Sequence, residues 1–297
     1  MNYLHSLILL VSLTSSTAFQ RPPYNAQYSP MYRISAGATD SVQTPNDPPS
    51  SRTWGLALQL DEGTRKSHSV AENTAFVTGF FRGLSNRESF GELVCSLYHV
   101  YCAMEKALDA STDSNVRTMD YEELRRKAAL ERDMQFFFGD DWLTRSPSPA
   151  TREYCAHIER TAQEAPYLLI AHQYTRYLGD LFGGQMMGNM ATRSLDLGDE
   201  GRGIDFYKFP EIPNNKEFIE DWYSKLNELD LTDAQKQAIV DEGNEVFRLN
   251  IEILEELEGN GALTAIKFAL GSMKRSLQEK LGLLRRSTSA TSSSTIP

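Results

Sequence analysis

Four glycines inside an otherwise helical pattern constrain this chain more than any other feature. The run 174–188 contains Gly179, Gly183, Gly184 and Gly188. Each glycine in a helix interior costs roughly 0.8–1.0 kcal/mol relative to alanine, or about 3–4 kcal/mol together. Gly179 and Gly183 share one helix face, so a large flat molecule could lie there against bare backbone, with Asp180 at its edge. A glycine hinge and a close helix crossing are the alternatives that the spacing leaves open.

The surrounding residues favour the flat molecule through a family resemblance. Residues 174–185, Tyr-Thr-Arg-Tyr-Leu-Gly-Asp-Leu-Phe-Gly-Gly-Gln, resemble the distal-helix signature of the haem oxygenases, in particular the animal and cyanobacterial type. Residues 64–73 resemble the proximal helix of that family, residues 96–101 its Ser-Leu-Tyr-His-x-Tyr stretch, and residues 247–257 its last core helix. Four blocks in family order are far more specific than any one of them.

The resemblance implies an all-α fold: a single-domain, multi-helix haem oxygenase-like fold with haem sandwiched between a proximal helix and a Gly-rich distal helix. The hydrophobic pattern agrees, because no convincing period-two strand is found and apolar residues recur at helical spacing. Helices are expected over 87–108, 119–138, 150–161, 166–195, 216–229, 233–257 and 263–284. Thr232 can cap the helix that starts at Asp233.

The resemblance identifies His68 as the residue that ligates the haem iron, with Glu72 one turn on as a partner of the site. A neutral imidazole suits this role, and its other ring nitrogen sets its character. On spacing alone, a lone helical histidine is more often a satisfied core or surface residue. His99 and His172 are expected to be structural, and His157 is expected at the surface.

On the distal side, the resemblance implies that oxygen binds against the bare backbone of Gly179 and Gly183. Asp180 matches the family's distal carboxylate, which orders the water that delivers a proton. Arg176 and Tyr101 match the positions that anchor this network, although a buried ion-pair arginine and a core tyrosine are the alternative readings. The remaining haem-contacting positions expected from the matched blocks are Thr175, Gly184, Phe247 and Asn250.

Tyr174 and Arg65 match positions that meet the haem propionates, and here the sequence departs from the family. Asp61, Ile219 and Tyr223 stand where family members carry bases, and Phe182 replaces a small hydroxyl residue. Cationic partners hold propionates by charge-assisted hydrogen bonds, so these changes leave the cleaved meso carbon undetermined. Lys216 or Lys225 could substitute if the helix register differs.

The ends of the chain have the composition of targeting and tail segments. Residues 1–18 resemble a signal peptide and residues 19–52 a transit peptide with a proline-rich linker; residues 53–284 form the expected domain and residues 285–297 a disordered Ser/Thr-rich tail. This arrangement resembles the bipartite presequence of algal plastid proteins, and ordinary secretion is the alternative. No later segment is long and apolar enough for a membrane anchor.

Charge and cysteine content exclude several classes. The net charge is −10 at pH 7, and residues 53–297 carry 27 basic and 38 acidic side chains, so nonspecific nucleic-acid binding is disfavoured. Three cysteines form no disulfide or zinc pattern, and no metal besides the haem iron is expected. The basic runs 125–127 and 274–275 are candidate faces for an acidic electron donor, and ordinary solvated helix surface is the alternative.

Together these features predict a monomeric haem oxygenase that converts haem, as both cofactor and substrate, with O2 and electrons to biliverdin, Fe2+ and CO. In a plastid the electron donor would be ferredoxin, with an NADPH-dependent reductase as the alternative, and the product would feed bilin synthesis. A non-catalytic haem sensor or carrier of the same fold is the main rival, and a thiaminase-like helical bundle is a weaker one.

Overall fold

The structure is a computed structural model that describes residues 49–81, 87–195, 197 and 201–257. The chain divides into two compact units, Met1–Pro49 and Ser50–Pro297, and every helix discussed below belongs to the second. The signal-like segment, nearly all of the transit-like segment, the helix expected over 263–284, the basic run 274–275 and the tail lie outside the described residues.

All regular structure in the described residues is helical, as the sequence predicts. The longer helices are α2 (Gly55–Glu72), α3 (Ala75–Phe81), α4 (Arg87–Ala110), α6 (Lys127–Phe138), α7 (Pro149–Glu164), α10 (Gly184–Ser194), α11 (Asn215–Glu228) and α12 (Asp233–Glu255). Short elements join them: η1 (Ser51–Thr53), α5 (Ser114–Thr118), η2 (Glu122–Leu124), η3 (Gly139–Thr144), η4 (Pro166–Leu168), α8 (Leu169–Gln173), η5 (Tyr174–Leu178), α9 (Gly179–Phe182) and η6 (Asp205–Tyr207). Most of these are 3-10 turns, whereas η5 is a π-helix.

The predicted helices 87–108 and 233–257 are confirmed to within two residues at each end. Along α4, the buried face carries Phe90, Val94, Leu97, Tyr101, Met104 and Leu108 at three-four spacing. Thr232 caps α12 through a capping box with Gln235, as expected from its position before Asp233.

The helix predicted over 119–138 begins late, at Lys127, and the residues before it form only the short turn η2. The cause is a contact with α4. The buried Glu105 carboxylate accepts hydrogen bonds from the backbone N–H groups of Arg126 at 2.6 Å and Lys127 at 3.1 Å. These are donors that the first turn of a helix leaves unsatisfied, so Glu105 fixes where α6 starts.

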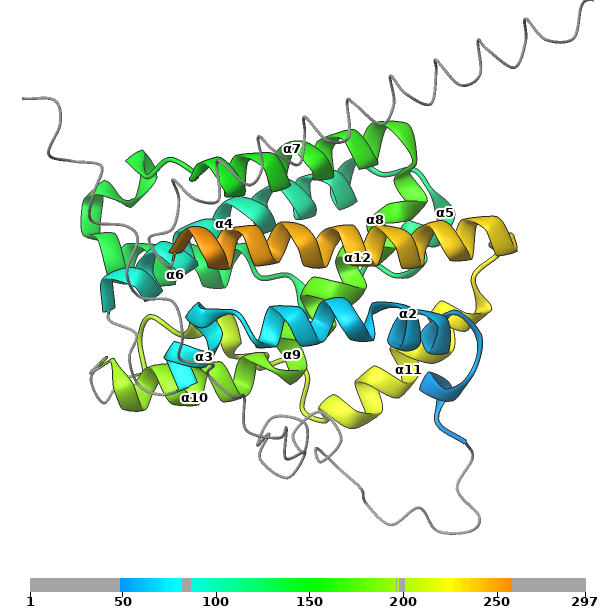
Figure 1. Cartoon of the computed structure of the whole chain (residues 1–297), viewed down its shortest axis with the longest axis horizontal. Helices are drawn as coiled ribbons and strands as arrows, with labels where there is room; N and C mark the ends of the chain where they lie inside the picture. The colour runs from blue at the N-terminus through cyan, green and yellow to red at the C-terminus, as the bar shows by residue number, and fades with distance from the viewer. Residues whose placement is uncertain (1–48, 82–86, 196, 198–200, 258–297) are drawn as a thin grey trace, which may run out of the picture. The chain divides into compact units, whose positions relative to one another are not determined.

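Helix α12 is central to the packing: α2 lies against it on one side, and α7 and α8 on the other (Figure 1). The close contact with α2 depends on two glycines. A Cβ on Gly63 would lie 2.3 Å from Val240 Cγ1, and one on Gly243 would lie 3.0 Å from Thr64 Cγ2. The Ser67 hydroxyl donates to Asn244 Oδ1 at 2.5 Å, and Asn244 Nδ2 donates to the Gly63 carbonyl. These contacts hold α2, which carries His68, firmly against α12.

Among the described residues, no helix combines the length and the apolar character that crossing a bilayer requires.

Candidate functional site

The glycine-rich segment is one continuous helical path with irregular hydrogen bonding, running from α8 through the π-helix η5 and α9 into α10. We call residues 174–188 the distal segment. A π-helical turn widens the backbone, and such turns are frequent at functional sites. α9 and α10 are joined at Gly183, whose backbone N–H still donates to the Gly179 carbonyl at 2.8 Å.

The four glycines of the distal segment serve two different purposes. A Cβ on Gly179 would meet nothing within 4 Å, and one on Gly183 would meet only the Gly179 carbonyl oxygen. By contrast, a Cβ on Gly184 would lie 2.8 Å from the Tyr207 ring, and one on Gly188 would lie 3.0 Å from Tyr207 Cβ. Gly179 therefore leaves open space beside the backbone, a Cβ on Gly183 would lie 3.2 Å from the Gly179 carbonyl oxygen, and Gly184 and Gly188 make room for Tyr207.

Asp180 lies next to this open space and is held by two side chains. Arg176, one turn earlier, donates from Nη2 to Asp180 Oδ1 at 2.8 Å and to Oδ2 at 2.7 Å. The Tyr101 hydroxyl from α4 donates a short hydrogen bond to Asp180 Oδ2. Arg176 is held in turn, because its Nη1 donates to Asn250 Oδ1 on α12 at 2.5 Å. The structure brings Tyr101 and Arg176 to Asp180, as the sequence predicts, and adds Asn250, which was predicted only as a haem-contacting residue.

The electrostatics of this group are those of a buried ion pair. Burial raises the pKa of the Asp180 carboxyl, and the Arg176 guanidinium and the Tyr101 hydroxyl pull it back down. Burial alone would lower the pKa of Arg176, but the Asp180 carboxylate, Tyr101 and Tyr154 together outweigh it and raise that pKa. Asp180 therefore takes up a proton more readily than an exposed aspartate, while Arg176 remains charged.

His68 lies on α2 and is half exposed, with 48% of its side chain accessible. Its Nδ1 is 3.6 Å from Glu72 Oε1, and its ring meets the edge of Phe247 on α12 at a centroid distance of 5.6 Å. With Nδ1 directed at Glu72, Nε2 is the nitrogen suited to an external ligand. The sequence-predicted pair His68 and Glu72 is therefore close, though farther apart than a direct hydrogen bond.

The two halves of the site meet at α12. Phe247 touches His68, and Asn250, one turn along the same helix, touches Arg176 of the distal segment. The ring of Phe247 adds an apolar contact beside His68. An accessible imidazole on one side and bare backbone on the other fit haem.

Thr175 and Arg65 occupy different environments from these residues. Thr175 is buried, and its hydroxyl has no hydrogen-bond partner among the described residues. The side chain of Arg65 is 65% exposed and lies 3.4 Å from Asp61 on the same helix. A residue that sequence reasoning assigned to the linker, Arg52, also pairs with Asp61. Arg52 is absent from the predicted site because the composition of residues 19–52 indicated a linker.

The positions that depart from the family pattern differ in their surroundings. Ile219 and Tyr223 are buried in the core. Lys225 forms an ion pair with Asp221 at 3.1 Å and lies over the Tyr121 ring, so it is engaged away from Asp61 and Arg65. Phe182 is 47% exposed.

The basic run 125–127 does not form the docking face considered from the sequence. Arg125 is largely buried and pairs with Asp120 at 2.7 Å. Arg126 is buried and lies over the Phe209 ring at 4.0 Å. Of the three, only Lys127 presents an exposed charge. The two arginines are structural because the chain turns inward at this point to begin α6.

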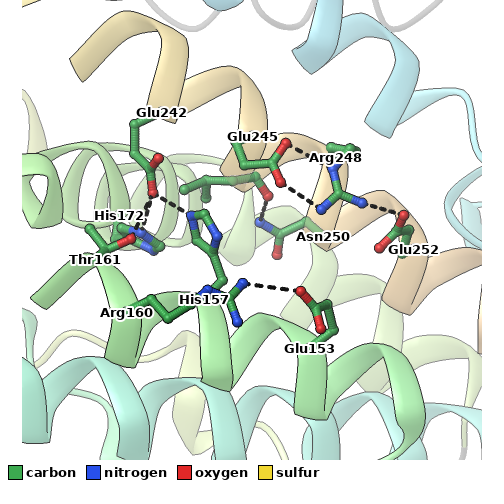
Figure 2. A network of polar contacts seen from close by, with 11 residues as sticks. Glu153, His157, Arg160, Thr161, His172, Glu242, Glu245, Arg248, Asn250 and Glu252 are labelled. Carbon is green, nitrogen blue, oxygen red and sulfur yellow. Dashed lines mark hydrogen bonds and ion pairs between the residues drawn. The ribbon is translucent and has the colours of Figure 1, made fainter. Parts of the chain in front are cut away.

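A second polar cluster joins α7, α8 and α12 (Figure 2). Glu242 Oε1 lies 2.7 Å from His157 Nε2 and 2.9 Å from His172 Nε2. His172 is structural, as expected, but His157 is only 18% exposed and so is not the surface residue that the sequence suggested. Hydrogen bonds from both histidines outweigh burial and lower the pKa of Glu242 to about 2.

These three side chains have the spacing of metal ligands, yet Nε2 of each histidine is already hydrogen-bonded to Glu242. Burial lowers the pKa of His172, so its ring is neutral and donates from Nε2 to Glu242. A cation on Nε2 would move the proton to Nδ1, which is buried without a partner among the described residues. We therefore interpret the cluster as a set of hydrogen bonds that holds α7, α8 and α12 together.

Known proteins match the chain from α2 to α12. The family model described as Heme oxygenase matches residues 54–256. A heme oxygenase of Pyropia yezoensis is 42% identical over 207 residues, covering 69% of this chain and 87% of that protein. Heme oxygenase 1 of Homo sapiens is 39% identical over 213 residues, covering 71% and 74% respectively. The crystal structure of heme oxygenase-1 from the cyanobacterium Synechocystis in complex with heme superposes with a TM-score of 0.67 at 39% identity, covering 74% of this chain and all of that one. Sequence, fold and site geometry agree, and the chain belongs to the haem oxygenase family.

Proposed function

We propose that this chain cleaves haem in the space between α2 and the distal segment, with His68 as the iron ligand and Asp180 as the distal carboxylate. As a haem oxygenase, the chain uses haem as cofactor and substrate, with O2 and reducing equivalents, and gives biliverdin, Fe2+ and CO. The observation that carries the residue assignment is the Asp180 carboxylate, fixed by Arg176 and Tyr101 beside a glycine whose missing side chain faces open space.

Bound haem supplies the iron at which O2 is activated. The protein's part on the proximal side is to hold that iron through His68 Nε2 and to orient the ring through Glu72. Gly179 and Gly183 allow the porphyrin and its distal ligand to approach the main chain, where any larger residue would fill the space.

Asp180 acts through a bound water. A carboxylate has about four lone-pair positions. Two on Oδ2 are filled by Tyr101 and Arg176, and one on Oδ1 is filled by Arg176. The remaining position on Oδ1 can hold a water molecule, orient it towards the distal face and relay a proton to it. This geometry is suited to turnover, and nothing in the site favours a non-catalytic haem carrier.

We further propose that the enzyme works in a plastid, receives electrons from ferredoxin and supplies biliverdin for bilin chromophores. The presequence-like composition of residues 1–52 and the similarity to a Pyropia enzyme support this assignment. Turnover should be supported by reduced ferredoxin with its reductase at a higher rate than by an NADPH-dependent flavoprotein reductase. A preference for the flavoprotein would overturn the ferredoxin assignment.

The residue assignment is tested by optical spectra of the protein with one equivalent of haem, followed during electron supply in air. In the wild type, the Soret band should disappear as biliverdin absorption grows. Asp180→Ala should bind haem but form biliverdin at least about a hundredfold more slowly, since general acid-base groups contribute 10²–10⁴-fold. His68→Ala should change the Soret band itself. Asp141→Ala, at an exposed carboxylate, is the matched control and should behave as wild type. Normal turnover by Asp180→Ala would refute its assigned role.

A further inference from the structure

The first turn of the helical unit is tied down to α11 and is not a free linker end. The Ser50 hydroxyl donates to Glu220 Oε1 at 2.6 Å, and the Ser51 backbone N–H donates to Glu220 Oε2 at 2.9 Å. Asn227 Nδ2 donates to the Ser51 carbonyl at 2.8 Å. Three hydrogen bonds on two successive residues fix the backbone of η1, and they thereby fix the starting point of the Arg52 side chain.

From that point Arg52 reaches the N-terminal half of α2. Its Nη2 donates to Asp61 Oδ1 in a short ion pair, while Arg65 Nη2 lies 3.4 Å from Asp61 Oδ2. One carboxylate is thus flanked by two guanidinium groups, and the three residues together carry a net charge of about +1. Asp61 contacts Arg52 through one nitrogen, and a guanidinium has five N–H donors, so further donors can serve a second anion.

This cluster is placed at one end of the proposed haem site. Asp61 precedes His68 by seven residues, almost two helical turns, so both lie on the same face of α2. Tyr174 of the distal segment lies close to this cluster. Burial raises the pKa of the Tyr174 hydroxyl, and a hydrogen bond with Thr64 lowers it. The negative charge of Asp61 raises the same pKa, and the positive charge of Arg52 lowers it. The charges of Asp61 and Arg52 also act on the pKa of the buried Tyr223 hydroxyl.

We propose that Arg52 is a substrate-binding residue that donates to a haem propionate, and that Asp61 is a positioning residue that holds Arg52 and Arg65 side by side. This inference rests on the proposed haem site. It explains how an acid can occupy a position where a propionate approaches: the negative charge of Asp61 is more than balanced by its two arginines. The propionate edge of haem would then be recognised partly by Arg52, which precedes the first long helix.

The test compares haem with its dimethyl ester, which lacks the propionate charges. Dissociation constants are measured by Soret titration of the ferric protein, without turnover. Arg52→Gln should weaken haem binding by about fivefold to tenfold, a reduced value for a charge-assisted bond at a half-exposed site. It should change binding of the dimethyl ester by less than about twofold, and Arg52→Lys should retain most of the affinity for haem.

Two further variants separate a direct contact from a structural one. Adding Asp61→Asn to Arg52→Gln should restore part of the haem affinity, because it removes a carboxylate that then repels the propionate. Arg117→Ala, at an exposed ion pair with Asp120, is the matched control. Equal weakening of haem and dimethyl ester by Arg52→Gln, or no weakening of either, would overturn the proposal. His68→Ala measured in parallel tests the haem site independently, since only that variant should alter the shape of the Soret band.

Discussion

At the scale of single residues, Asp180 depends on its neighbours for both its position and its charge. Arg176 alone could hold the carboxylate, since it contacts both oxygens. Tyr101 adds a donor on Oδ2 from a different helix, so the carboxylate cannot rotate about its contact with Arg176 Nη2 without losing a bond. The family resemblance predicts that Tyr101 and Arg176 anchor this network, but not which oxygen of Asp180 each of them contacts.

Tyr101→Phe should shift the pH dependence of biliverdin formation. Burial raises the pKa of Asp180 and the Tyr101 hydrogen bond opposes that rise. Removing the hydroxyl therefore raises the pKa of Asp180 further. If the ionised carboxylate holds the water, activity falls as pH drops through this pKa, so the acidic limb of the profile should move to higher pH in the variant. The profile is measured at saturating haem, and Tyr98→Phe serves as the control. An unmoved acidic limb would contradict the role given to Tyr101.

At the scale of elements, the distal segment contains glycines that the sequence cannot tell apart. Helical spacing predicted bare backbone, and Gly179 confirms open space there. Gly184 and Gly188 instead accommodate Tyr207, whose turn η6 has no periodic signal that would place it against α10. The same limit explains the late start of α6, which is set by Glu105, about twenty residues earlier in the chain. Periodicity predicts which residues form helices, whereas contacts between distant residues decide where helices begin and what lies against them.

Gly179→Ala and Gly184→Ala should therefore affect the stability of the haem-free protein in opposite directions. A methyl group at Gly179 meets no atom beyond the nearby backbone of its own helix within 4 Å, so the haem-free protein should be as stable as wild type or up to about 1 kcal/mol more stable. Its haem affinity should fall because the methyl group occupies ligand space. At Gly184 a methyl group would lie 2.8 Å from Tyr207, and stability should fall by about 1–3 kcal/mol. Urea unfolding and Soret titration measure the two properties. Loss of stability in Gly179→Ala would show that its space is not open.

At the scale of the whole helical unit, the cluster of His157, His172 and Glu242 joins three helices whose positions determine the site. It connects α7 and α8 to α12 (Figure 2). Helix α12 in turn carries Phe247 and Asn250 to the two halves of the proposed haem site. The sequence offered no sign of it, because three residues separated by up to 85 positions share no local pattern. Its contribution to folding should be visible as a dependence of stability on pH.

The sign of that dependence follows from Glu242, whose pKa is lowered from 4.5 to about 2 in the folded protein. A lowered carboxyl pKa stabilises the fold above pH 4.5, and the contribution is lost as pH falls towards 2. At neutral pH it is on the order of 3 kcal/mol. Burial also lowers the pKa of His172 below its ordinary 6.5, so protonation of this histidine in the unfolded chain adds to the loss of stability in acid.

Glu242→Gln should thus be less stable than wild type at pH 7, with the difference shrinking between pH 4.5 and pH 3 in urea unfolding of the haem-free protein. Asp241→Asn, at the exposed neighbouring position on α12, should have a free energy of unfolding that differs from that of the wild type by the same amount at every pH. A difference between Glu242→Gln and wild type that does not change with pH would mean that the carboxylate contributes packing alone.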